Sequence, residues 1–219
     1  MLKILIVPLI LLSLLAQFPW SPQPEPPKEK PPVEGWQMVS YFAVAPTKYS
    51  REGKGIIKAE SRGARSALYR RVREKEENYS LLSWRWKISN VVHSTIETRK
   101  DRFDAAARVM VVFGKEQPFR LFQGGDPVGF RIEYIWASHL PKGKIFDHPG
   151  ERDCKVFVLE SGDGKAGEWV DERRNIRKDF KTAFGADAPT VFAIGLQTDT
   201  DHSNEKVTAY YSEPILRKR

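Results

Sequence analysis

The sequence predicts a mostly β fold, an antiparallel β-sandwich of jelly-roll type with one helix near residues 171–184. Three observations predict it. Several segments alternate apolar and polar residues, turn-forming Gly, Pro, Asn and Asp separate these segments, and helical periodicity is confined to one stretch. The single cysteine, Cys154, excludes an intrachain disulfide, so the fold must depend on an apolar core, in which Cys154 is expected to be buried.

The N-terminal residues predict export. Lys3 precedes the apolar run from Ile4 to Ala16, which is typical of a secretory signal peptide over residues 1–18, with a retained membrane tether as the alternative. Prolines recur from Pro19 to Pro32, so residues 19–34 are expected to form an extended linker, either a stalk or a leader. Residues 35–219 then form one β-sandwich domain in the periplasm or outside the cell.

Period-two alternation predicts the strands. In the segment from Leu82 to Ile88, apolar residues alternate with Ser83, Arg85 and Lys87, as in a strand with one buried face, and Trp84 and Trp86 are assigned to that face. The same reasoning predicts strands at 37–45, 54–61, 67–73, 107–113, 130–137, 156–160, 190–198 and 206–216.

One segment has helical spacing instead. Asp171 is a suitable N-cap, Ile176 and Phe180 lie on one apolar stripe, and Gly185 is a suitable C-terminal stop. The helix is expected to cover exposed strand hydrogen bonds at an edge of the sandwich.

The formal net charge of +8 favours anionic partners. In an exported protein these are an anionic polysaccharide or a cell-envelope surface, whereas nucleic acid is excluded by location and a membrane is contacted only through an uncleaved N-terminus. The alternative is that the basic residues coat solvated faces.

Five segments, in order, carry a family resemblance. They are WRWKI at 84–88, DAAARVMVVF at 104–113, YIWAS at 134–138, GEWVDERRNIRKDFKTAFG at 167–185 and GLQTDTDHSN at 195–204. Together they resemble the exported bacterial family grouped as domain of unknown function 3047, and the resemblance implies a jelly-roll sandwich similar to carbohydrate-binding domains. One departure is that Phe103 precedes Asp104, where the family tends to carry a second aspartate.

The loop from Thr198 to Glu205 is a candidate cation site. Asp199, Asp201 and Asn204 offer oxygen ligands of the kind that calcium prefers, and no other cofactor is predicted. The alternative is that Asp and Asn occur there as turn formers, because they bond their own backbone.

A ligand-binding set is also predicted. If their strands are neighbours, the polar residues Arg85, Lys87, Arg108, Arg131 and Glu133 form one cationic sheet face, in which Arg85 and Arg108 are the preferred ligand-binding residues. Asp104 and His202 join this set, provided that Asp104 lies beside the 199–204 loop. The alternative is an ordinary solvated sheet face.

Two functions follow from these residues. The leading hypothesis is a non-catalytic binding module for carbohydrate or another anionic envelope ligand, because His93, His139, His148 and His202 fall into no catalytic pattern with Tyr134 or Tyr210. The alternative is a jelly-roll polysaccharide lyase or hydrolase acting on acidic glycans. No catalytic residue is predicted.

Overall fold

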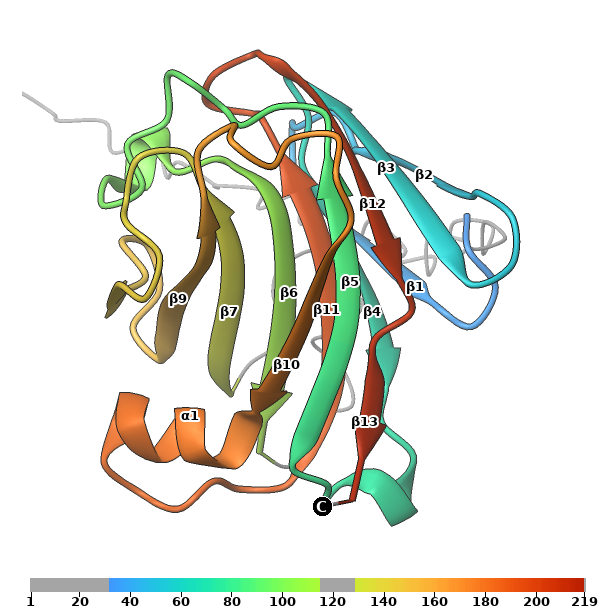
Figure 1. Ribbon diagram of the computed structural model, residues 1–219, viewed down its shortest axis with the longest axis vertical. Coiled ribbons are helices and arrows are strands. Elements are labelled where there is room, and N and C mark those ends of the chain that lie inside the picture. Colours follow the sequence, from blue (N-terminus) through green and yellow to red (C-terminus); the bar gives the residue numbers. More distant parts are fainter. Residues whose placement is uncertain (1–31, 115–128, 219) are drawn as a thin grey trace, which may run out of the picture. The chain divides into compact units, whose positions relative to one another are not determined.

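The computed structural model describes residues 32–114 and 129–218, which form two β-sheets packed face to face (Figure 1). The predicted signal peptide and nearly all of the predicted linker lie outside these residues. No helix among the described residues is long and apolar enough to cross a membrane.

Each sheet combines strands from distant parts of the chain. The larger sheet has seven strands, in the order β1 (Gln37–Ser40), β4 (Ser66–Arg71), β11 (Val191–Asp199), β6 (Ala105–Phe113), β7 (Phe130–Ala137), β9 (Cys154–Ser161) and β8 (Ile145–Asp147). The smaller sheet has six strands: β10 (Val170–Asn175), β5 (Leu81–Ile88), β12 (Lys206–Ser212), β3 (Ile56–Arg62) and β2 (Lys48–Arg51), with β13 (Ile215–Arg217) paired to β5.

The chain passes repeatedly from one sheet to the other. Strands β3 to β6 alternate between the sheets, and so do β10 to β12, which is the crossing pattern of a jelly-roll sandwich. All described strand pairs are antiparallel except β7 with β9. The predicted fold class is therefore confirmed.

The main core lies between the sheets. Trp84 and Trp86 on β5 are buried there, and their rings lie 5.4 Å from Tyr134 and 5.9 Å from Trp136, both on β7 of the other sheet. These aromatic contacts join the two layers, and they confirm the assignment of the β5 tryptophans to the core. Cys154 is buried, as expected.

The central strands of the seven-stranded sheet are buried on both faces. All nine residues of β6 are buried, and Met110 and Val112, which point away from the sandwich core, belong to a second apolar cluster with Tyr69. An ordinary solvated face is therefore the wrong description of this side of the sheet, and polar residues on it are buried among apolar ones.

Helix α1 (Ile176–Phe184) lies at the end of the sandwich where β6 terminates, and its Phe180 packs 4.8 Å from Phe113 (Figure 1). Asn175 caps it by accepting the backbone N–H of Lys178, and Gly185 ends it with a φ of 71°, as predicted. The predicted start at Asp171 is wrong, because residues 170–175 pair with β5 and are the edge strand β10.

Candidate functional site

Arg108 is the centre of a buried ion network on the outer face of the seven-stranded sheet. Its Nε and one terminal nitrogen donate to the two carboxylate oxygens of Asp199 at 3.1 and 2.9 Å, and the other terminal nitrogen donates to Glu133 at 2.9 Å. A further N–H donates to the carbonyl of Phe103, so four of its five N–H groups are used. The predicted ligand-binding residue Arg108 is thus engaged within the protein.

Charges around Arg108 alternate in sign. Arg131 donates to Glu133 at 3.0 Å and also pairs with Glu151. Burial alone would raise the pKa of Glu133, but Arg131, together with Arg108, holds it well below its usual range. Burial raises the pKa of Asp199 to about 6, in spite of the opposing effect of Arg108.

Asp104 does lie beside the loop that follows β11. Its side chain is fully buried, and it accepts the backbone N–H of Ser203 at 2.7 Å and that of His202 at 3.3 Å. The ring Nδ1 of His202 lies 3.1 Å from the same carboxylate. Three of the predicted ligand-binding residues, Asp104, Arg108 and His202, therefore gather around this loop.

The predicted cation ligands have different partners. Asp199 accepts hydrogen bonds from Arg108 and from the backbone N–H of Ala105, while Asn204 has a φ of 60°, the conformation of a turn former. Asp201 instead groups with Asp104 and His202, whose ligand atoms all lie within 4.8 Å of one another. The calcium site over Asp199, Asp201 and Asn204 remains a prediction.

A small polar pocket of about 140 Å3 opens next to this network. It is lined by residues that include Lys100, Phe103, Arg108, His148, Asp199 and His202, and we call it the polar pocket. Burial lowers the pKa of His148 to about 4, so its ring is neutral at neutral pH. Since His148 Nδ1 accepts the N–H of Gly150 at 3.1 Å, its Nε2 carries the proton.

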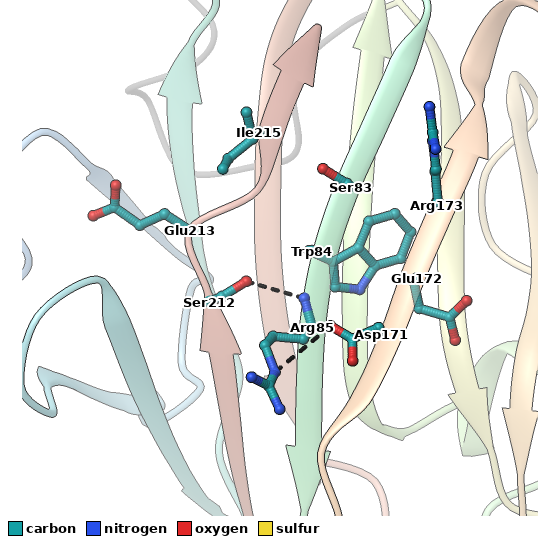
Figure 2. Close-up of a pocket in the computed structure, with 9 residues that line it drawn as sticks. All are labelled: Ser83, Trp84, Arg85, Asp171, Glu172, Arg173, Ser212, Glu213 and Ile215. Carbon is teal, nitrogen blue, oxygen red and sulfur yellow. Dashed lines mark hydrogen bonds and ion pairs between the residues drawn. The ribbon is translucent and has the colours of Figure 1, made fainter.

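Arg85 is in the other sheet, so the predicted single cationic face is wrong. Strand β5 belongs to the six-stranded sheet, whereas Arg108, Arg131 and Glu133 are on β6 and β7 of the larger sheet. Figure 2 shows Arg85 at a pocket of about 330 Å3, whose lining includes Ser83, Asp171, Arg173 and Ser212. The backbone N–H of Arg85 donates to the Ser212 hydroxyl at 3.0 Å.

Two aromatic rings extend this second site along the same sheet face. The Arg85 guanidinium lies 4.9 Å from the Trp169 ring, and the Lys87 ammonium lies 5.3 Å from Trp169 and 4.6 Å from Tyr210. Trp169 and Tyr210 have ring centroids 6.4 Å apart. We call Arg85, Lys87, Trp169 and Tyr210, together with the adjoining pocket, the outer binding surface.

Sequence reasoning did not assign Tyr210 or Lys100 to a binding site. Tyr210 had a usable signal, since the burial of Val207, Ala209 and Tyr211 places the alternate residues of β12 on the outer face. For Lys100 the signal was its place in the basic cluster from Arg99 to Arg102, which does not distinguish it from the neighbouring arginines. It lies in a short 3-10 turn, Lys100–Arg102, between β5 and β6.

Solved structures with similar folds act on or bind carbohydrates. The xyloglucanase domain of NopAA, a type three effector from Sinorhizobium fredii in complex with cellobiose, is 8% identical, with a TM-score of 0.48, over 85% of this chain and 94% of that chain. A family 12 xyloglucanase from Bacillus licheniformis is 8% identical, with a TM-score of 0.41, over 85% and 88%. A family 30 carbohydrate-binding module of Clostridium thermocellum is 9% identical, with a TM-score of 0.37, over 83% and 86%.

These likenesses concern the fold alone. No curated protein matches the chain. A family model described as protein of unknown function (DUF3047) matches residues 34–215, which is most of the chain. The chain therefore belongs to the DUF3047 family.

Proposed function

We propose that this protein is an exported module that binds an acidic polysaccharide on the outer binding surface. The observation that carries the proposal is the placement of two aromatic rings, Trp169 and Tyr210, and two cations, Arg85 and Lys87, on one face of the six-stranded sheet. Each ring lies within contact distance of a cation, and no other strand covers this side of the sheet among the described residues.

The chemistry of this surface matches both parts of an acidic sugar. Aromatic faces pack against the C–H groups of a sugar ring, while guanidinium and ammonium groups pair with its carboxylate. Arg85 remains available, because its side chain is 46% exposed and its contact with Asp171 is a long 3.7 Å pair between exposed groups.

The adjoining pocket supplies further donors. Ser83 and Ser212 contribute hydroxyls, and Arg173 contributes a second guanidinium, on the same side as Arg85. Polar groups placed around a concavity fix the orientation of a ligand, and hydroxyl-rich ligands need several of them. A volume of about 330 Å3 is in the range of small-ligand sites.

Charge and export support the same class of ligand. The net charge of +8 attracts polyanions over a distance beyond direct contact. The signal-like segment from Lys3 to Ala16 motivates a location outside the cytoplasm, where the anionic polymers of envelopes and walls occur.

Calorimetric titration tests the proposal. We expect saturable binding of polygalacturonate or alginate, weaker binding of neutral cello-oligosaccharides, and a loss of affinity of at least about fivefold in Arg85→Met and in Lys87→Met. Lys178→Met, which removes the same charge from an exposed position on α1, is the matched control and should bind as the unaltered protein does. Equal affinities of all three variants for the polysaccharide would show that it does not bind at the outer binding surface.

A further inference from the structure

The polar pocket lies on the opposite sheet from the outer binding surface and has different chemistry. Its volume of about 140 Å3 corresponds to roughly four or five water molecules at about 30 Å3 each. That space accommodates a carboxylate with its adjoining ring carbons. Three side chains that line the pocket, those of Arg108, His202 and Lys100, could act on such a ligand.

Arg108 is not available to a ligand, because Asp199, Glu133 and the Phe103 carbonyl already take four of its N–H groups. The ring of Phe103 lies 4.0 Å from the Arg108 guanidinium and 5.1 Å from the His148 ring. Arg108 and Phe103 thus form a fixed wall of the pocket.

His202 is available, and its tautomer is fixed. The Asp104 carboxylate only accepts hydrogen bonds, so His202 Nδ1, at 3.1 Å from it, carries the proton. In the neutral ring this leaves Nε2 as the nitrogen that can take a proton. Asp104 is itself held by two backbone N–H groups and is fully buried, whereas the His202 side chain is 27% exposed, so a rigid carboxylate orients an accessible imidazole.

Lys100 is available as a cation. It lines the same pocket as His202. Within the part of the chain that the structure describes, it forms no ion pair. Its stem lies over Gly150, where an added Cβ would be 3.2 Å from Lys100 Cγ and 3.6 Å from His148 Cε1. Gly150 therefore leaves the space in which Lys100 and His148 approach each other.

We propose that the polar pocket is a β-elimination site for uronic-acid polymers, with His202 as the general base, Asp104 as its positioning residue and Lys100 as the partner of the substrate carboxylate. A cation beside the carboxylate stabilises the negative charge that develops when the neighbouring C–H bond is broken. A base with a fixed tautomer in the same pocket as that cation supplies the second requirement.

The step is balanced without a further reactant. His202 Nε2 takes the proton from C5, the carbon next to the carboxylate. The electrons of that C–H bond form the C4=C5 double bond while the C4–O4 bond breaks. The departing O4 takes a proton from solvent and the His202 imidazolium returns one to solvent, so the products are an unsaturated uronide end and a free hydroxyl, and no water, oxidant or reductant is consumed.

The ultraviolet absorbance of the unsaturated product tests this directly. We expect the full chain to generate it from polygalacturonate or alginate, and His202→Gln to lower kcat/KM by at least about a hundredfold. His139→Gln is the matched control, because it changes an exposed histidine that does not line the pocket. Absence of product from both polymers, or full activity of His202→Gln, would overturn the proposal.

Two further variants separate a chemical role from a structural one. Lys100→Met should raise KM more than it lowers kcat, because it removes the contact with the carboxylate. Asp104→Asn should lower kcat/KM and change the shape of the pH–rate profile, whereas a purely structural aspartate would lower the melting temperature with the profile unchanged. The proposal has its own readout, since binding heat without unsaturated product rejects the elimination and leaves the polysaccharide-binding proposal standing.

Discussion

Arg108 and Asp199 form a two-point ion pair at 3.1 and 2.9 Å inside the protein, with 3% and 1% of their side chains exposed. Replacing Asp199 by a neutral residue leaves the buried Arg108 to share Glu133 with Arg131, so positive charge in the buried network is no longer fully compensated. We expect Asp199→Asn to lower the free energy of unfolding by about 3–5 kcal/mol, measured by urea denaturation. Asp171→Asn, in an exposed aspartate, should change it by less than about 0.5 kcal/mol. Similar values for both variants would mean that the buried pair contributes no more than a surface contact.

Glu172 makes stability depend on pH in the neutral range. Burial, reinforced by nearby Glu160, raises its pKa to about 7. A carboxyl with a raised pKa contributes stability that is present below its unfolded pKa, near 4.5, and is lost as pH rises through about 7. Glu172→Gln should therefore match the unaltered protein at acidic pH and exceed it at pH of about 8, by about 1–2 kcal/mol after allowance for partial exposure. Thermal denaturation of both proteins across this pH range checks this prediction. A stability difference between them that is the same at every pH would contradict it.

The effect of His148 on the pH dependence of stability is opposite to that of Glu172. Because burial lowers its pKa to about 4, the neutral ring contributes stability above the unfolded pKa of about 6.5, and this is lost as pH falls through about 4. We expect His148→Gln to flatten the loss of stability over this acidic range by about 2–3 kcal/mol. The exposed-residue variant His139→Gln should keep the slope of the unaltered protein. An unchanged slope in His148→Gln would show that other groups cause the acid sensitivity.

Gly195 allows close packing on the outer face of the seven-stranded sheet. A Cβ at this position would lie 2.5 Å from Tyr69 Cε1 and 2.8 Å from Met110 Cε, which is closer than such atoms approach in proteins. Gly195→Ala should cost about 1–3 kcal/mol by overpacking, measured by urea denaturation. Gly164→Ala, with nothing within 4 Å of its added Cβ, is the control. Equal stability of both variants would mean that Tyr69 and Met110 move aside at no cost.

Local patterning predicted much of the fold. Alternation over Leu82 to Ile88 indicated β5 and its buried tryptophans, because a half-buried strand has this period. It missed β10, since the polar sequence VDERRN has no buried apolar alternation and is a strand because it pairs with β5. Because of the same pairing, the helix begins at Ile176 and not at Asp171.

The candidate sites depend on contacts that local pattern does not contain. Arg108 and Asp199 are 91 residues apart in sequence, and only the pairing of β6 with β11 brings them together. The prediction of one cationic face failed for the same reason. Both Arg85 and Arg108 alternate with apolar residues, but topology places β5 and β6 in different sheets. The sequence did suggest that Asp104 lies beside the 199–204 loop, and the hydrogen bond from Ser203 N–H to its carboxylate places it there.

The most direct test of the proposed function is the response of the Trp169 indole N–H in an NMR titration with oligogalacturonate. Its signal can be assigned by comparison with Trp169→Phe. The account predicts that this signal shifts and saturates, while those of Trp86 and Trp136, which are buried in the core and do not line the pocket, stay in place. A Trp169 signal that does not move while the protein binds the ligand would contradict polysaccharide binding at the outer binding surface.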